Sequence, residues 1–522
     1  MRSGRLVQNL SSQSPDEPYM HAEHDGIVHF PLGAASYIYE EEFFKPKLRE
    51  LGLIPPSAHF PHRPRKASSD TTAVLASTSS DAPLSTDVES DSGISLTPEP
   101  SAESTSTLII HIGAQPNNSP HAGTIVTFTL AFLVARAMKR EYAKLRARAA
   151  SEGMDLTGWA DRLDVRIQLD LVDTAPDSAK TTTGPDGIVY QRSHRSTGAM
   201  CDFLPDYHAL LAELSAFIGG EIEYSVTYQD ALMRTPAMRD ALRAIVLDRV
   251  RLASELAPQR EAPAIRCACP APDCGTADKH GILNEYEVTE DTTTITFHCP
   301  THGPHSVRLE DPDERARIEL NTPLRNLART LVYLADTVAS RPSPSGDEAG
   351  GPPTRVHMRV TGADYSGAYQ ESMLFRPLAR LAMRMQPPLP LHEDGVWPVI
   401  MYAPLITDWS GAKLSKSLYV RDGAYKYLED AGMDWLLEFR RMREEGLDRT
   451  VLYRMVETWV EKPTTLFGRN YTVDYVRLTY KKTEREKEKE SESETVIGAK
   501  RKAEDEGEGG LSVRARVETA SS

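Results

Sequence analysis

The chain has 522 residues, of which 40% are hydrophobic, and its formal net charge is -15. This length allows about two or three modules around a large buried core. No apolar run approaches the roughly 20 residues that span a bilayer, so a membrane-spanning protein is not expected. The negative charge argues against attraction to nucleic acid over the whole surface, although a local basic face could still exist.

Residues 1–5 open a segment without the apolar core of a secretory signal, and the acidic residues Asp16 and Glu17 disfavour a transit peptide. We therefore expect a cytoplasmic protein. Four of the five cysteines lie between residues 267 and 299, a clustering that indicates a metal site rather than a disulfide framework. The sequence does not predict an oligomeric state.

The N-terminal extension, residues 1–63, carries no recognisable chemistry. Residues 64–106 consist mainly of Ser, Thr, Asp and Pro with almost no large apolar side chains. Such a segment cannot bury enough surface to offset the entropy of ordering, so we predict a disordered linker or a phosphorylatable insertion.

A strand–turn–helix unit begins at residue 107. It combines an apolar run at 107–113, a turn rich in Pro and Asn at 116–120, and a helix predicted over 122–149. A unit of this kind opens a doubly wound parallel sheet, in which ligands bind beyond the carboxyl end of the strand. His121 is expected at that position, where its imidazole and the helical N–H groups could meet a phosphate.

The next strand is predicted over 163–173, followed by a Thr-rich loop to about residue 187. Asp170 and Asp173 lie at the end of this strand. One role for a carboxylate at such a position is only to face solvent or to cap the end of the strand. Helical apolar spacing over 205–257 predicts helices that pack around an insertion.

Two cysteine knuckles joined by a hairpin predict a zinc ribbon. The expected ligands are Cys269, Cys274, Cys299 and His302. Tetrahedral thiolate and imidazole ligands stabilise a fold too small to hold itself together, and a site with no open position would be structural. The spacing of Cys267 and His305 also permits coordination, and cysteines without a metal remain the alternative.

After a helix over 323–339 and a flexible stretch over 341–353, a strand at 356–362 ends in Gly362-Ala363-Asp364, followed by an amphipathic helix over 369–385. A glycine at this turn permits close approach of a ligand to the backbone. The last strand, 399–406, leads into residues 411–417, which we call the lysine loop. Lys413 and Lys416 bracket Ser415 there, an arrangement that suits a polyphosphate or, alternatively, is a solvated basic loop.

Residues 422–460 have the apolar spacing of packed helices. From about residue 481, runs of Lys and Glu predict a charged solvated helix or a disordered tail.

Two of these segments together resemble the signatures of class I aminoacyl-tRNA synthetases and of the wider nucleotidylyl transferase superfamily. Residues 121–124, HAGT, are similar to the HIGH motif, with Thr124 in place of the second histidine. Residues 413–417, KLSKS, are similar to the KMSKS motif, with Leu414 in place of Met. Residues 111–114, HIGA, imitate the first motif more literally, but we interpret them as part of a buried strand.

The resemblance implies a Rossmann-like α/β core with a doubly wound parallel sheet, an inserted zinc ribbon and a short C-terminal helical region. Zinc knuckles between the two signatures make the archaeal-type class I lysyl-tRNA synthetases the nearest match, so lysine is the suspected amino acid. A full lysyl enzyme would continue with a sizeable anticodon-binding domain. The packable sequence after the lysine loop is too short for one, which puts tRNA specificity in doubt.

By the same resemblance, an amino acid carboxylate attacks the α-phosphate of ATP and pyrophosphate leaves. The implied catalytic residues are His121, Lys413 and Lys416. The implied ATP-binding residues are Asn118, Gly123, Thr124, Gly362, Asp364 and Ser415. Asp170 and Asp173 are candidates for binding the substrate's amino group. The implied cofactors are ATP, Mg²⁺ and structural Zn²⁺, and the partners are an amino acid, ATP and, as a candidate acceptor, tRNA.

Two alternatives remain: a synthetase paralogue or nucleotidylyl transferase that acts on a non-tRNA acceptor, and a non-catalytic synthetase-like interaction protein. The predicted organisation is an extension (1–63), a disordered linker (64–106), the first half of the nucleotide-binding core with a helical insertion (107–265), the zinc ribbon (266–308), the second half of the core with the lysine loop (309–425), a helical region (426–480) and a charged disordered tail (481–522).

Overall fold

The computed structural model describes residues 43–55, 104–185, 187–342, 352–391, 396–409, 411–414, 425–466 and 470–509, without the side chains of residues 178, 464, 465 and 493–509. Two predicted site residues, Ser415 and Lys416, lie outside the described residues. The linker predicted over 64–106 also lies outside them except for residues 104–106, as does the end of the predicted tail, 510–522.

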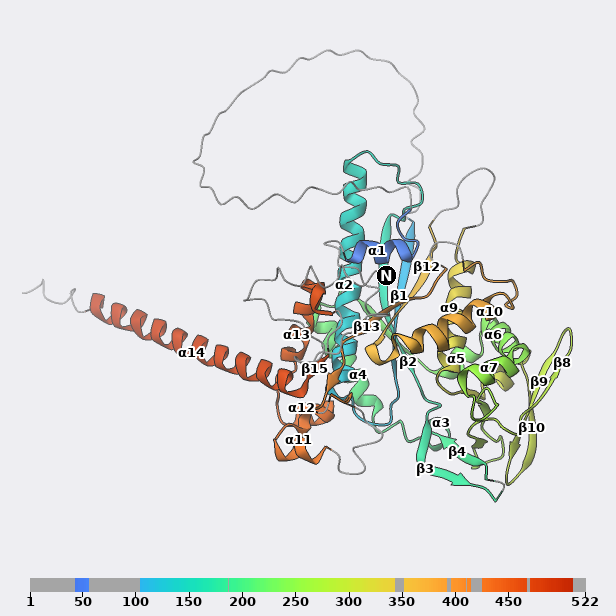
Figure 1. Cartoon of the computed structure of the whole chain (residues 1–522). Helices are drawn as coiled ribbons and strands as arrows, with labels where there is room; N and C mark the ends of the chain where they lie inside the picture. Colours follow the sequence, from blue (N-terminus) through green and yellow to red (C-terminus); the bar gives the residue numbers. More distant parts are fainter. Residues whose placement is uncertain are drawn as a thin grey trace, which may run out of the picture.

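A five-stranded parallel sheet forms the centre of the protein (Figure 1). Its strands, in spatial order, are β13 (Val399–Ala403), β12 (Arg355–Gly362), β1 (Thr105–Ala114), β2 (Arg162–Leu171) and β5 (Glu223–Thr227). The chain moves outward from β1 through β2 to β5, then returns to the other side of β1 for β12 and β13. The order reverses between β1 and β12, the kind of switch point at which such sheets bind ligands. The predicted doubly wound parallel α/β fold is confirmed.

One face of the sheet packs against the long helix α2 (Ala122–Ser151), and Leu108, Ile110 and Ile112 of β1 are buried in this core. Helices α1 (Phe44–Glu50), α4 (Leu204–Phe217) and α13 (Thr450–Glu461) pack beside α2. By length and composition α2 could cross a membrane, but 67% of its most apolar window is buried inside the protein. Its place in the core accounts for its apolar sequence.

The other face of the sheet carries α9 (Leu324–Ala339), which lies against β12. Helix α9 also packs on α6 (Pro236–Leu247), and both helices contribute to a second hydrophobic core. We call the segment that the chain inserts between β5 and α9 the inserted module. Around the second core lie α5 (Gln229–Met233), α7 (Arg249–Leu256), α8 (Pro312–Arg315), α10 (Arg376–Ala382), the pair β6 (Ile265–Cys267) and β11 (Ile318–Leu320), and the antiparallel sheet of β8 (Glu285–Val288), β9 (Thr293–Cys299) and β10 (Gly303–Arg308).

A buried arginine of the inserted module, Arg266 on β6, links the module to the end of the main sheet. The guanidinium of Arg266 lies 2.8 Å from Glu319, and both side chains are 2% exposed or less. The same guanidinium donates a hydrogen bond to the backbone carbonyl of Thr174, just beyond the end of β2. The module is therefore anchored where the main sheet ends.

Two predicted segments differ from the structure. The Thr-rich stretch expected to be a loop is the hairpin β3 (Pro176–Thr183) and β4 (Val189–Ser193), extended by β7 (Thr276–Asp278) of the inserted module. The stretch 205–257, expected to be helical throughout, is interrupted by β5, the edge strand of the main sheet. Strands β4 and β5 contain many polar residues, and they pair with β7 and β2, which lie far away in the sequence. Local sequence patterns do not reveal such pairing.

The C-terminal region is helical, as predicted. The segment from about residue 481, predicted to be a charged solvated helix or a disordered tail, is helical as far as Gly509. Helix α14 (Val473–Gly509) projects away from the body (Figure 1). Lys487 in its first half pairs with Asp448 of the body, 2.5 Å away. The remaining elements are α3 (His194–Thr197), η3 (Ala363–Tyr365), the π-helix η4 (Tyr369–Phe375), β14 (Ile406–Thr407), α11 (Lys426–Asp430), η5 (Asp434–Leu437), α12 (Phe439–Glu444), η6 (Pro463–Leu466) and β15 (Tyr471–Thr472).

Candidate functional site

A pocket of about 170 Å³ opens at the carboxyl edge of the sheet, beside the switch point between β1 and β12; we call it the edge pocket. His121, Gly123 and Thr124 line it from the start of α2, Gly362 from the end of β12, and Lys413 from the lysine loop. Segments that lie far apart in the sequence therefore converge on one cavity. Its position is the one at which doubly wound sheets bind nucleotides.

His121 caps α2. Its backbone is extended, with φ -89° and ψ 169°, and its Nδ1 accepts a hydrogen bond from the N–H of Gly123 at 3.0 Å. A neutral ring that accepts at Nδ1 carries its proton on Nε2. The N–H groups of Thr124 and Ile125 donate to the carbonyl of His121 and form the first turn of α2. Because His121, Gly123 and Thr124 line the pocket, the positive end of the helix dipole lies there. This end of α2 suits an anionic ligand.

Two glycines leave room for neighbouring side chains at the edge pocket. A Cβ on Gly123 would lie 2.9 Å from Cε1 of His121, and a Cβ on Gly362 would lie 2.5 Å from Oδ1 of Asp364. Both distances are shorter than real contacts. Glycine at these positions therefore allows His121 and Asp364 to take the positions described here.

Lys413 is held at the pocket by Asp364, with 2.6 Å between Nζ and Oδ2. A β-bridge to Thr407 fixes its backbone, and its ammonium lies 5.9 Å from the centre of the Tyr365 ring. The carboxylate expected to bind ATP thus neutralises the lysine expected to bind phosphate. Asn118, the other predicted ATP ligand of this region, lies in the turn before α2 and is not among the residues that line the pocket.

Asp170 is buried at the end of β2 with three hydrogen-bonding neighbours: Nδ1 of His111 at 3.1 Å and the hydroxyl of Tyr333 at 2.8 Å on Oδ2, and the amide of Gln168 at 2.9 Å on Oδ1. Burial by itself would raise the pKa of this carboxyl group. The charges of His111 and Arg329, with the hydrogen bonds from His111 and Gln168, outweigh burial and hold the pKa of Asp170 well below its ordinary value. Asp170 is therefore an ionised carboxylate in a mostly dry site.

A smaller cavity of about 50 Å³, the inner pocket, is lined by Asp170, Arg359 and Gly113. Gly113 also lines the edge pocket, so the two cavities adjoin at the end of β1. Asp173 lies elsewhere: it is 2% exposed, and its Oδ2 pairs with Nε of Arg195 at 2.8 Å. Of the two predicted carboxylates, Asp170 reaches a cavity and Asp173 forms a buried ion pair.

Several residues around the inner pocket have no role predicted from the sequence. His111 lies inside β1, so its placement in a buried strand is confirmed, but its side chain contacts Asp170 and His357. Tyr333 stacks on His111 with ring centres 3.8 Å apart. A signal was present in the strands: Gln168 and Asp170 alternate with apolar residues, as do His357 and Arg359. Polar residues on one face of strands that otherwise appear buried indicate a functional face.

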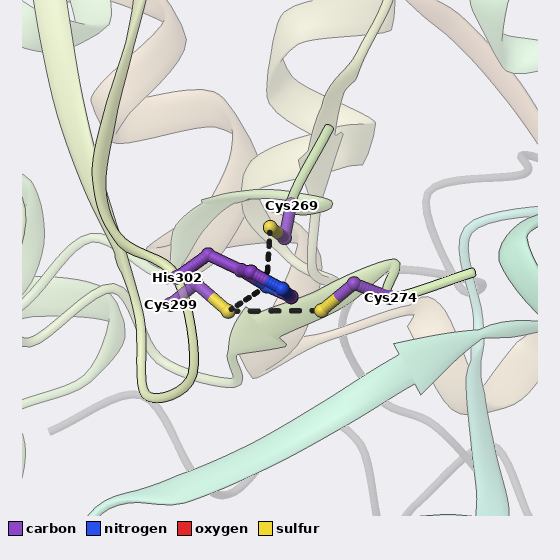
Figure 2. A group of neighbouring side chains, drawn as sticks. All are labelled: Cys269, Cys274, Cys299 and His302. Atoms are coloured by element: carbon purple, nitrogen blue, oxygen red, sulfur yellow. Dashed lines mark hydrogen bonds between the residues drawn. The ribbon is translucent and has the colours of Figure 1, made fainter. Parts of the chain in front are cut away.

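The four expected metal ligands, Cys269, Cys274, Cys299 and His302, come together in the inserted module, with ligand atoms all within 4.8 Å of one another (Figure 2). The sulfurs of Cys274 and Cys299 are 3.7 Å apart, and Nδ1 of His302 lies 3.5 Å from the sulfur of Cys269. Tetrahedral zinc with Zn–S bonds of about 2.3 Å separates its sulfurs by ~3.8 Å. The donor set and its spacing fit a zinc ion.

The two alternative ligands do not belong to this cluster. Cys267 is buried in β6, its thiol lies 3.6 Å from the carbonyl oxygen of Ala268, and burial raises its pKa to about 12. His305 lies on β10, and burial lowers its pKa.

Comparisons with known proteins add little at the level of sequence. No family model matches the chain, and no curated protein matches it. Among solved structures, a Campylobacter jejuni protein assigned as an arginyl-tRNA synthetase is 10% identical, with a TM-score of 0.24 over 64% of this chain and 62% of that one. Thermus thermophilus arginyl-tRNA synthetase is 11% identical, with a TM-score of 0.27 over 72% of this chain and 60% of that one. The chain spans less than two thirds of either structure, and at these scores the likeness carries no argument about function.

Proposed function

We propose that the protein activates an amino acid with ATP, forming an aminoacyl-adenylate and releasing pyrophosphate. The observation that carries this proposal is the convergence of the two signature segments on the edge pocket, with His121, Gly123 and Thr124 on one side and Lys413 on the other. Separate elements that deliver an imidazole, a helix N-terminus and a lysine to one cavity are suited to a polyphosphate.

In this mechanism, the protein positions its substrates and stabilises charge. His121 and the N-terminus of α2 contact the phosphates. Lys413 moves from Asp364 to the departing pyrophosphate, whose charge grows as the bond to the α-phosphate breaks. Gly362 lets the nucleotide approach the backbone at the end of β12. A Mg²⁺ ion on the polyphosphate would neutralise further charge.

The inner pocket, with about 50 Å³, takes only the ammonium end of the amino acid, next to the α-phosphate. This arrangement follows from the shared wall at Gly113, because the attacking carboxylate must reach the nucleotide directly. The ionised carboxylate of Asp170 binds an ammonium group of the substrate. We propose lysine as the first amino acid to test, on the resemblance of the zinc knuckles between the two signature segments. We propose tRNA as the first acceptor, on the resemblance of the signature segments themselves.

The test is amino-acid-dependent exchange of pyrophosphate into ATP, measured on purified protein with each standard amino acid. We expect exchange with one amino acid and its loss in Lys416→Ala. Transfer to tRNA or to another acceptor is then measured with that amino acid. Absence of exchange with every amino acid, with and without tRNA, in folded and zinc-loaded protein would contradict adenylation. It would favour a different nucleotidylyl transfer reaction or a non-catalytic synthetase-like interaction protein.

A further inference from the structure

A line of hydrogen-bonded side chains connects α9 with the end of β2 through the polar face of the sheet. Nε2 of His357 lies 2.8 Å from Oδ2 of Asp336, and Nδ1 of His357 lies 2.8 Å from Nε2 of His111. Nδ1 of His111 then lies 3.1 Å from Oδ2 of Asp170. The side chains of His111, His357 and Asp170 are 8% exposed or less. We call these four residues the histidine relay.

The geometry of the relay determines how many protons it holds. Asp170 and Asp336 accept hydrogen bonds, so each of the two outer ring nitrogens carries a proton. The two inner nitrogens face each other at 2.8 Å, a distance that requires a proton between them. The pair of rings therefore carries three protons, which makes one ring an imidazolium. With only two protons, either two lone pairs would face each other or a carboxylate would lose its donor.

The surroundings indicate which ring holds the charge. Burial lowers the pKa of His357 to about 4, against the opposing effect of its hydrogen bond to Asp336, so His357 is the neutral acceptor. His111 then donates from both nitrogens and faces the ionised carboxylate of Asp170. The other charged or titratable groups around the two rings are Tyr333 and Arg329 of α9 and Arg355 and Arg359 of β12.

We propose that His111, His357 and Asp336 are positioning residues that orient Asp170 for the ammonium group of the amino acid. The proposal rests on the proposed function. A carboxylate offers about four acceptor positions. Oδ2 of Asp170 accepts from His111 and Tyr333, and Oδ1 accepts from Gln168. One acceptor position on Oδ1 therefore remains for a ligand. The relay keeps this position fixed.

Asp336, at the end of the relay opposite Asp170, permits a test with a matched control. Asp336 also pairs with the exposed guanidinium of Arg355, at 2.9 Å and 3.1 Å, and lines a cavity of about 690 Å³. Asp336→Asn removes the charge that holds His357, whereas Arg355→Gln removes only the exposed partner of the same carboxylate. We expect Asp336→Asn to raise the KM for the amino acid about tenfold or more without changing the KM for ATP, and Arg355→Gln to leave both constants unchanged. Equal constants in Asp336→Asn and the unmodified protein would overturn the proposal.

A second measurement does not depend on activity. Nitrogen NMR of protein labelled with ¹⁵N-histidine, at about pH 8 where ordinary histidines are neutral, reports the protonation of each ring. We expect one ring with both nitrogens protonated, absent in His111→Phe and neutral in His357→Phe; both substitutions keep a ring to stack on Tyr333. If no such ring is present, the three-proton relay is wrong. If it is present but the unmodified protein shows no exchange with any amino acid, the relay stands and the proposed function fails.

Discussion

The ammonium of Lys413 lies 2.6 Å from the carboxylate of Asp364, which joins the lysine loop to the end of β12. The two side chains are 40% and 33% exposed, and ion pairs at such positions contribute only about 0.2–1 kcal/mol to stability. The pair therefore matters mainly for where it keeps the lysine. It holds the ammonium at the edge pocket, where the proposed function requires Lys413 to exchange its carboxylate partner for a phosphate.

Replacement of Lys413 tests this role. We expect Lys413→Ala to lower the rate of amino-acid-dependent pyrophosphate exchange by about 100-fold or more, because a cation opposite the developing charge is lost. The midpoint of thermal unfolding should change little. Lys426→Ala, on the exposed side of α11, is the matched control and should keep full exchange. Similar losses in the two variants would count against a specific role for Lys413.

Gly123→Ala separates binding from stability. The added methyl group would lie 2.9 Å from the His121 ring and would displace it from the edge pocket. Within a helix, alanine is more favourable than glycine by roughly 0.5–1 kcal/mol. Displacement of the His121 ring also removes its cap on α2, a loss of about 1 kcal/mol that offsets this gain. We expect weaker ATP binding, measured by calorimetry, with little change in resistance to urea. Unchanged ATP affinity would show that the position of His121 does not matter for the nucleotide.

The cluster of Cys269, Cys274, Cys299 and His302 predicts that the protein binds one zinc ion per chain. We expect metal analysis to find zinc in the purified protein and to find it lost in Cys274→Ser, because one thiolate of a four-ligand site is removed. Limited proteolysis should then cut the inserted module, since structural zinc supplies much of the folding free energy of such modules. Cys201→Ser, at an exposed cysteine outside the cluster, should retain the metal and the protection. Full zinc content in Cys274→Ser would refute this ligand set.

Burial of His357 makes stability depend on pH. The pKa of His357 is lowered to about 4, whereas a histidine of the unfolded chain titrates near 6.5. As the pH falls, the unfolded state therefore takes up the proton first. The stabilisation is complete above about pH 6.5 and is lost towards pH 4, by up to ~3 kcal/mol.

Urea unfolding at about pH 7 and about pH 4.5 measures this loss. We expect a smaller decrease in His357→Phe than in the unmodified protein. Some decrease should remain, because burial also lowers the pKa of His280 to about 4. An identical decrease in both proteins would show that His357 does not carry the effect.

Local patterns in the sequence were enough to predict much of the fold. The apolar strand at β1, the turn before α2 and the long apolar helix α2 follow from periodicity and turn residues, which act over a few neighbouring positions. The spacing of the cysteine knuckles likewise predicted a cluster that the structure brings together. The roles of Ser415 and Lys416 stay predictions, because these residues lie outside the described part of the chain.

The sequence by itself determined which chemical groups the protein carries and which local elements present them. Only the tertiary structure decided which of these groups meet. Lys413 pairs with Asp364 because the lysine loop returns to the end of β12, and His111 contacts His357 and Asp170 because β1 lies between β12 and β2. Such contacts depend on strand order and register, which are set by packing between distant segments, so they cannot be read from any single stretch of the chain.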